Sequence, residues 1–330
     1  MIIQINNFTQ IMTTSHNLER FHQIDFNKII DHPNILIAAN FWDTDRFQAA
    51  RICYKFMRAI DDMIDNYKAE NKEISVSERK WFENQVKEWL QAVKTGNHDD
   101  DPLKKDLITT IDTFRIPHWT LEDFAKAMLY DIDHDGFETI DTFINYSQGA
   151  SVAPSSIFVH LCGISRSNGT YNDPVFDVRE AAKPCALFSY LVHIIRDFQK
   201  DQFDNLSYFA DSTIIKYGLT RELLSDFAHG TPIPQAFRDM IREYVALAEK
   251  YRIQTLEVID KISPFLEAKY QLSLNIIYNL YDMVYKRIDV DHGQFTSKEL
   301  NPDAEEVKER VLQTILDFEN AQKNNISIPI

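Results

Sequence analysis

The segment YKFMRAIDDMID, residues 54–65, decides the fold class because its side chains recur at helical spacing. Tyr54, Arg58, Asp61 and Asp65 fall at i, i+4, i+7 and i+11, so they form one polar stripe along a helix. Apolar residues recur three and four positions apart around this stripe: Ile52, Phe56, Ala59, Met63 and Tyr67. The segment is therefore predicted to be a mostly apolar helix that carries two carboxylates on one face.

A second segment, YLVHIIRDFQKD, repeats this arrangement with Tyr190, His193, Asp197 and Asp201 at i, i+3, i+7 and i+11. In each stripe two Asp residues lie four apart, about 6 Å between Cβ atoms, and such a pair can share a divalent cation. The spacing alone is common in a chain rich in Asp, and a solvated helix face would show it too. Burying carboxylates on an apolar helix, however, is costly unless a metal or a cation compensates them. We expect the two stripes to face each other at one metal-lined pocket mouth.

The rest of the chain also favours helices. It has 330 residues, 44% of them hydrophobic, and only 8 Gly. Asp101-Pro102 and Asn301-Pro302 are typical of a helix start, and the residues that begin at Ser75 and Thr120 have capping-box spacing. Strand signals are few and no linker is apparent. We predict an all-α fold with a single domain over residues 1–330, loosely ordered at 1–25 and 319–330.

The net charge and the cysteine content indicate which binding partners and which cellular compartment to expect. The net charge of −15 argues against a nucleic-acid partner. Cys53, Cys162 and Cys185 are an odd number without CxxC spacing, which favours reduced thiols in the cytoplasm. No signal peptide and no apolar run long enough to span a bilayer are apparent. Peripheral membrane contact and the oligomeric state stay open.

The stretch DIDHDGFETIDT first suggests calcium. Asp131, Asp133, Asp135 and Gly136 match the beginning of an EF-hand loop. The twelfth position, which needs a bidentate Glu, is Thr142, and no second loop of this kind occurs. A calcium site is therefore not expected here.

Taken together, these segments resemble the squalene/phytoene synthase family, the head-to-head trans-prenyl diphosphate synthases. The stripe that begins at Tyr54 matches the first aspartate-rich motif of the family, and IIRDFQKD, residues 194–201, resembles the second. The segment YDIDHDGFETIDTFINYSQGASVA resembles the stretch between them, with Asp131, Phe137 and Tyr146 in register. The similarity covers about residues 34–285.

The resemblance implies an isoprenoid-synthase-like helical bundle around a central cavity. It also implies Mg²⁺ on the two motifs and two allylic prenyl diphosphates, C15 or C20, as substrates. Their head-to-head condensation passes through a cyclopropylcarbinyl diphosphate and gives a terpenoid hydrocarbon such as squalene or the carotenoid precursor phytoene. NADPH is implied only if the product is squalene, and the chain has no G-x-G-x-x-G motif for it.

The resemblance assigns three groups of candidate residues. The metal ligands are Asp61, Asp65, Asp197 and Asp201, with His193 as a fifth. The catalytic group, which grips diphosphate or moves a proton, is Tyr54, Arg58, Tyr146, His193 and Arg196. Aromatic ring faces can stabilise a carbocation, and the expected pocket is lined by Tyr130, Asp131, Phe137, Tyr146, Gln148, Ser151, Phe158, Phe188, Tyr190 and Tyr278. Core packing is the alternative role for most of these aromatic residues.

The second motif departs from the family pattern. Tyr190 and His193 stand where Gln and Asn are expected, Lys200 replaces a Glu, and Leu206 replaces an Arg. His193 fits a metal ligand, a general base or a core histidine. Imidazole is a softer donor than Mg²⁺ prefers.

Two further segments also depart. HPNILIAA, residues 32–39, replaces the N-terminal Ser-x-Ser-Phe segment, and DVDHGQFTSK, residues 289–298, replaces an Arg-rich one. These changes keep two alternative functions open, a terpene-synthase-like cyclisation and a non-catalytic relative that binds prenyl lipids.

Overall fold

The computed structural model describes residues 15–29, 34–70 and 74–324. The N-terminal half consists of α1 (His16–Gln23), α2 (Phe26–Ile29), α3 (Asn34–Ala39), α4 (Thr44–Glu70), α5 (Val76–Thr95), α6 (Pro102–Phe114), α7 (His118–Asp133), α8 (Ile140–Ser147), the π-helical turn η1 (Gln148–Val152) and α9 (Ala153–Gly163). A short antiparallel hairpin of β1 (Ser165–Ser167) and β2 (Thr170–Asn172) follows. The C-terminal half consists of α10 (Val178–Arg196), α11 (Phe198–Phe203), α12 (Asp211–Lys216), α13 (Arg221–Ala228), α14 (Gln235–Ile262), the 3₁₀ turn η2 (Ser263–Phe265), α15 (Ala268–Tyr285), α16 (Ser297–Leu300) and α17 (Ala304–Asn324). The predicted all-α fold class is confirmed.

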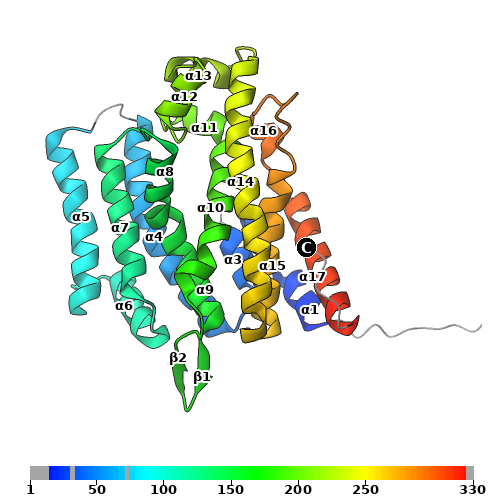
Figure 1. Cartoon of the computed structure of the whole chain (residues 1–330). Helices are drawn as coiled ribbons and strands as arrows, with labels where there is room; N and C mark the ends of the chain where they lie inside the picture. The colour runs from blue at the N-terminus through cyan, green and yellow to red at the C-terminus, as the bar shows by residue number, and fades with distance from the viewer. Residues whose placement is uncertain (1–14, 30–33, 71–73, 325–330) are drawn as a thin grey trace, which may run out of the picture.

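Helix α10 lies at the centre of the bundle, between α9 and α14 (Figure 1). Its side chains are buried on most faces, among them Leu187, Leu191, Ile194 and Ile195. Helices α4 and α7 pack against α9 and against each other, and α5 and α6 form one outer edge. Helices α15 and α17 form the opposite side, while the short helices α11 to α13 close one end of the bundle. A helix that is apolar around its circumference belongs in the interior, and this one brings its polar C-terminal stripe there.

Local sequence explains several helix ends. The Ser75 hydroxyl accepts from the Glu78 backbone N–H in a complete capping box, and the Asp101 carboxylate caps α6 in front of Pro102. Two expected starts are wrong. Thr120 lies inside α7 and donates to the Pro117 carbonyl, while α17 begins after Asp303, two residues later than expected. Asp303 and Glu306 exchange the capping hydrogen bonds there.

The described parts of both chain ends are helical. Ser15 caps α1, and the Ser15 hydroxyl and the Asn17 amide donate to Glu319 Oε1 on α17 at 2.5 and 3.0 Å. These hydrogen bonds join α1 to α17, which the sequence could not reveal because the partners are far apart in the chain. The remainder of the expected loose ends, residues 1–14 and 325–330, lies outside the described residues.

The π-helical turn η1 packs tightly against α7. A Cβ added at Gly149 would lie 2.1 Å from the Asp123 carbonyl oxygen and 2.8 Å from the Ala127 Cβ atom. Only a glycine therefore permits this approach between η1 and α7.

Replacing Gly149 by Ala is expected to lower the free energy of unfolding by about 2–3 kcal/mol, because the backbone of α7 must move. Urea denaturation followed by circular dichroism measures this change. Gly96→Ala is the control, since Gly96 has a φ of +73° but no atom within 4 Å of the added Cβ. It should cost about 1 kcal/mol from backbone strain alone. Equal losses in the two variants would contradict the packing argument.

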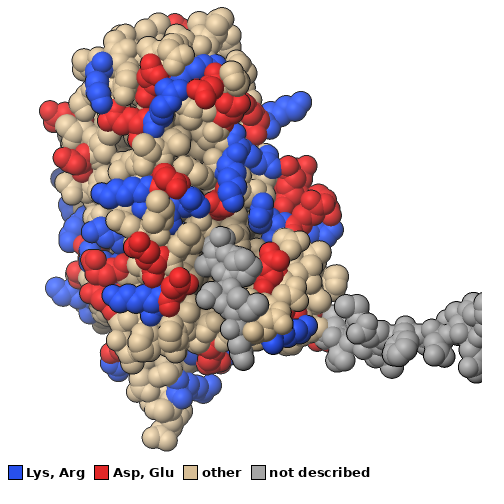
Figure 2. Space-filling view, turned by 45° about the vertical axis from the view of Figure 1, so that its right-hand side comes forward, with Lys and Arg blue, Asp and Glu red and all other residues tan. Residues whose placement is uncertain are grey.

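The surface shows no one-sided charge field on the face that Figure 2 presents, where acidic and basic side chains are interspersed. None of the helices within the described ranges is long and apolar enough to cross a membrane.

Candidate active site

A cavity of about 1010 Å³ lies between α4, α9, α10 and α15, with α3 and α14 closing its sides. Both predicted stripes face it. Helix α4 contributes Tyr54, Arg58, Asp61 and Asp65. Helices α10 and α11 contribute Tyr190, His193, Arg196, Asp197, Lys200 and Asp201. Two segments more than 120 residues apart in the chain thus meet at one polar end of a largely apolar cavity.

The cavity-facing part of α4 carries more carboxylates than basic side chains: Asp61, Asp62 and Asp65 against Arg58. Arg58 Nη1 donates to Asp61 Oδ2 at 2.8 Å, and its other nitrogen pairs with Asp62. Burial raises the pKa of Asp61 above its ordinary value, although Arg58 opposes the shift. Burial and the neighbouring Asp61 charge raise the pKa of Asp65 to about 7. Raised carboxylate pKa values of this kind indicate a site that gains from a bound cation.

Asp197, which joins the end of α10 to α11, is held by a fork of hydrogen bonds. Arg196 donates to its two carboxylate oxygens at 2.7 and 2.6 Å. Burial tends to raise the pKa of Asp197, but His193 and Arg196 outweigh it, and the pKa lies below its ordinary value. Asp197 is therefore charged and already paired within the protein.

The His193 ring contacts both Arg196 and Asp197. Arg196 Nη2 lies 3.0 Å from His193 Nδ1, and His193 Nε2 lies 3.0 Å from Asp197 Oδ2. Because a guanidinium can only donate, Nδ1 accepts and the ring proton sits on Nε2, where it donates to Asp197. Burial and the Arg196 charge lower the pKa of His193 to about 4. Both ring nitrogens are engaged in a neutral ring, so this geometry does not fit the metal-ligand role expected for His193.

Asp201 lies on α11 and is 7% exposed. Burial and Asp197 raise its pKa well above the ordinary value, and the charge of Asp65 adds to this from the facing helix. The two motifs thus repel each other electrostatically across the cavity mouth.

The donor set at the mouth fits Mg²⁺. Among the described residues no three His, Cys, Asp or Glu side chains converge closely enough to hold a metal by themselves. Mg²⁺ does not need such a cage, since it is usually bound by one or two carboxylates, waters and substrate phosphate oxygens. Asp61, Asp65 and Asp201 supply hard oxygen donors whose raised pKa values show incomplete compensation.

Tyr146 and Asp131 form a buried pair at the wall of the cavity. The Tyr146 hydroxyl donates to Asp131 Oδ2 at 2.6 Å, and Tyr146 lines the cavity while Asp131 stands behind it. Burial raises the pKa of Asp131 to about 8, against the opposing effect of the Tyr146 hydrogen bond. Asp131 therefore exchanges its proton near neutral pH, while Tyr146, whose pKa burial raises well above its ordinary value, keeps its hydroxyl proton.

The structure also explains the acidic stretch after Asp131. Asp133 pairs with Arg79 of α5, and Asp135 Oδ1 lies 3.8 Å from Lys68 Nζ of α4. Because these carboxylates have different partners, they do not form a calcium cage. The stretch is the end of α7 and the turn that leads into α8.

Only part of the expected pocket lining is in place. Tyr146, Ser151, Phe158 and Tyr190 line the cavity. The other six expected residues lie outside its lining: Tyr130, Asp131, Phe137, Gln148, Phe188 and Tyr278.

These six residues have other contacts. Phe188 packs against Tyr278 at 6.1 Å between ring centroids, and the Tyr278 hydroxyl accepts from Arg252 of α14 at 2.9 Å. Tyr130 stacks on Phe137 at 5.7 Å, and the Gln148 amide donates to its own helix at Ile144.

Most of the apolar lining was not singled out from the sequence. It includes Phe26, Cys53, Phe124, Ile157, Leu161, Val258, Ile259 and Leu274. Apolar residues at helical spacing carry the same pattern whether they line a cavity or pack in a core. Of the departing segment 289–298, only Ser297 reaches the cavity, and residues 32–33 lie outside the described ranges.

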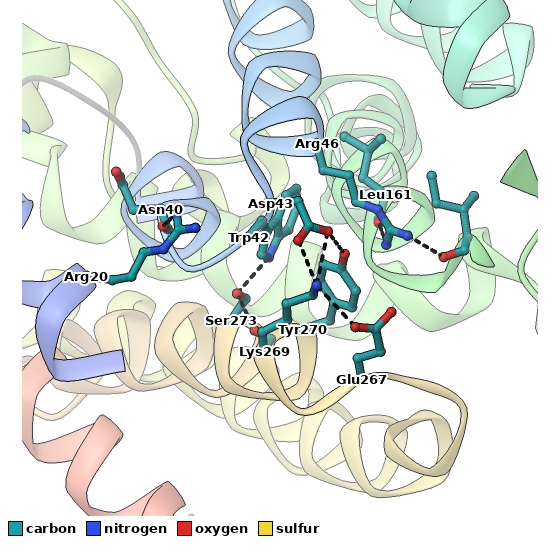
Figure 3. Close-up of polar contacts among 11 residues, drawn as sticks. Arg20, Asn40, Trp42, Asp43, Arg46, Leu161, Glu267, Lys269, Tyr270 and Ser273 are labelled. Carbon is teal, nitrogen blue, oxygen red and sulfur yellow. Dashed lines mark hydrogen bonds and ion pairs between the residues drawn. The ribbon is translucent and has the colours of Figure 1, made fainter. Parts of the chain in front are cut away.

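A layer of contacts supports the cavity behind Phe158. The Trp42 ring is fully buried and lies 4.6 Å from the Phe158 ring, and its Nε1 donates to Ser273 Oγ at 2.7 Å. Next to it, Asp43 accepts from Lys269 at 2.8 Å and from the Tyr270 hydroxyl at 2.9 Å (Figure 3). The corner between α3 and α4 is thereby fixed to the first turn of α15.

Arg46 joins the same layer to α9. It is 3% exposed and donates to the carbonyl oxygens of Leu161 and Ile164, both at 2.9 Å (Figure 3). Its guanidinium carbon lies 4.4 Å from the Tyr270 ring centroid, within cation–π range. One side chain from α4 thus caps the C-terminal end of α9 and contacts α15.

Solved structures with this fold include a dehydrosqualene synthase in complex with ligand, with a TM-score of 0.67 and 16% identity over 93% of this chain and 98% of the other. The squalene synthase HpnC from Alicyclobacillus acidocaldarius has a TM-score of 0.56 and 11% identity over 81% of this chain and all of the other. YisP from Bacillus subtilis has a TM-score of 0.53 and 14% identity over 91% of this chain and all of the other.

At these identities the likeness shows the fold, an all-α isoprenoid synthase fold. No curated protein matches the sequence. The model of the squalene/phytoene synthase family, in contrast, matches residues 33–306, most of the chain. The chain therefore belongs to the squalene/phytoene synthase family.

Proposed function

We propose that this protein is a Mg²⁺-dependent prenyltransferase that joins two C15 or C20 allylic diphosphates head-to-head and releases diphosphate. Family membership supports head-to-head prenyl condensation as the general activity. The observation that carries the proposal is that both carboxylate stripes face one cavity, which also has many apolar lining residues. A volume of about 1010 Å³ is at the top of the usual range of ligand pockets, about 300–1,000 Å³, as two long chains require.

In this proposal the residues at the mouth of the cavity bind the metal and the diphosphate, and those in its body contact the prenyl chains. Asp61, Asp65 and Asp201 would hold Mg²⁺, which when bound neutralises the departing diphosphate. Arg58 adds guanidinium donors at the same end. The ring faces of Tyr190 and Phe158 line the apolar body, where they can stabilise a carbocation and keep water away from it.

Protons released at the end of the reaction need an acceptor. Tyr146 lines the cavity and is hydrogen-bonded to Asp131, whose pKa of about 8 suits a group that exchanges protons near neutral pH. We assign proton transfer to this pair: the Tyr146 oxygen, which contacts substrate, would accept the released proton while its own hydroxyl proton passes to the ionised form of the Asp131 carboxylate.

The proposal predicts that purified protein with Mg²⁺ releases diphosphate from farnesyl or geranylgeranyl diphosphate, and that Asp61→Ala releases at least about 100-fold less. Mass spectrometry of the hexane extract, with and without NADPH, should show a C30 or C40 hydrocarbon. A C15 or C20 product would instead indicate cyclisation. Absence of both release and diphosphate binding would indicate a non-catalytic relative.

Phe158 is expected to limit chain length, because it lines the cavity with the buried Trp42 ring directly behind it. Phe158→Ala should shift the preference from the C15 towards the C20 substrate by about tenfold in kcat/KM. Competition between the two substrates measures the shift. Phe237→Leu is the control, since Phe237 is buried beside Phe198 and outside the cavity lining. If both variants show the same preference between the C15 and C20 substrates, Phe158 does not limit the chain length.

A further inference from the structure

Three basic side chains belong to the described lining of the cavity, and they differ in how firmly they are held. Arg58 bridges Asp61 and Asp62, and Arg196 forks onto Asp197. Lys200 has an ion pair with Asp204 at 3.1 Å, and its side chain is 67% exposed. Because an exposed i, i+4 ion pair contributes little to stability, the Lys200 ammonium can turn to a ligand at little cost.

Lys200 is also placed to act on both motifs. It lies on α11 immediately before Asp201, and it shares the cavity mouth with Asp61 and Asp65 of α4. All three carboxylates line the same cavity as Lys200, so one ammonium group shares this lining with carboxylates of both facing helices.

The position of this charge distinguishes the chain from its family pattern. Lys200 stands where Glu is expected, and Leu206, which stands where Arg is expected, lines the same cavity. The first exchange adds two positive units and the second removes one. The mouth is thus one unit more positive than the pattern, and Lys200, directly before Asp201 in the chain, carries the added charge.

We propose that Lys200 binds the substrate diphosphate directly and supplies part of the positive charge that a divalent cation would otherwise supply at this mouth. The inference rests on the proposed function, because it concerns the diphosphate that the same site binds. An ammonium donates up to three hydrogen bonds to phosphate oxygens as a point charge. The same charge repels a divalent cation from the ligand-free carboxylates.

The test uses inorganic diphosphate and Mn²⁺ on the full-length protein. In Mg²⁺-free buffer, Lys200→Gln should weaken diphosphate binding about tenfold by isothermal titration calorimetry. Without diphosphate, the same variant should bind Mn²⁺ about three- to tenfold more tightly by electron paramagnetic resonance. These opposite changes follow from removing one positive charge between carboxylates and phosphate, and general damage to the fold would weaken both.

Lys87→Gln is the matched control. Lys87 pairs with Glu83 at i, i+4 with 58% of its side chain exposed, and it lies on α5 outside the cavity lining. If Lys200→Gln leaves both affinities as unchanged as Lys87→Gln does, Lys200 is only a solvated lysine and the inference is overturned. If wild type binds no diphosphate even with Mg²⁺, the proposed function fails together with it.

Discussion

Replacing Asp65 by Asn is expected to lower diphosphate release by about a hundred- to thousandfold and, at the same time, to stabilise the ligand-free protein. The activity falls because the variant lacks a carboxylate that we propose as a ligand of the charge-neutralising cation. The stability rises because Asp65 is repelled by Asp61 and partly buried, with its pKa raised to about 7. Functional sites often store destabilising interactions of this kind.

The stabilisation expected for Asp65→Asn depends on pH, because the charge on Asp65 in wild type does. A carboxyl whose pKa is raised from about 3.9 in the unfolded chain to about 7 in the fold costs stability progressively as the pH rises between those values. Asp65→Asn should therefore equal wild type in stability near pH 4 and exceed it by about 1–2 kcal/mol at pH 8, after screening by water at the open mouth. Urea denaturation at the two pH values measures the difference.

Mg²⁺ provides a second measurement on the same variant. Millimolar Mg²⁺ with diphosphate should raise the melting temperature of wild type more than that of Asp65→Asn, because only wild type keeps the full donor set. Asp106→Asn, on the exposed side of α6, should behave as wild type in every respect. Lower stability of Asp65→Asn at pH 8 would show that Asp65 is compensated inside the protein, and would remove it as a cation ligand.

Replacing Arg46 by Ala should have the largest effect on stability, a loss of about 3–4 kcal/mol in the free energy of unfolding. Two carbonyl groups at the end of α9 lose their donors, which costs about 1–3 kcal/mol each where they stay buried. The contact with the Tyr270 ring is lost as well. The free energy of unfolding of Arg46→Lys should lie between those of wild type and Arg46→Ala, because one ammonium group cannot replace both hydrogen bonds of the planar guanidinium.

Arg51→Ala on the same helix is the control. Arg51 is hydrogen-bonded to Gln48 at the surface, and its removal should change the stability by less than about 0.5 kcal/mol. Thermal and urea denaturation of the three variants measure the order. If Arg46→Ala is no less stable than Arg51→Ala, the contacts behind the cavity do not hold α4, α9 and α15 together.

The sequence predicted the mouth of the cavity better than its body, for a physical reason. Polar side chains at i, i+4 and i+7 on apolar helices are conspicuous, and Asp61, Asp65, Asp197 and Asp201 do face one cavity. Apolar residues give no such contrast. Phe188 and Tyr190 lie two positions apart on α10, about 200° around the helix, and only Tyr190 reaches the cavity.

The sequence also left the role of His193 open among three alternatives. In the structure the fork of Arg196 places a donor atom opposite Nδ1, an arrangement that favours a neutral ring with its proton on Nε2. Side-chain rotamers of neighbouring residues set this arrangement, and no spacing rule predicts them.

The π-helical turn between α8 and α9 determines in which directions around the helix axis Tyr146 and Phe158 point. Tyr146 and Phe158 are 158 − 146 = 12 residues apart, and at about 100° per residue an unbroken α-helix would leave them about 120° out of phase. The wider turn at 148–152 accommodates about one extra residue and returns about 100° of that difference. Both rings therefore point into the same cavity. Conversion of this turn to regular α-helix with no residue lost would rotate Tyr146 and Phe158 about 100° away from each other, whereas deletion of the one extra residue would keep their relative phase.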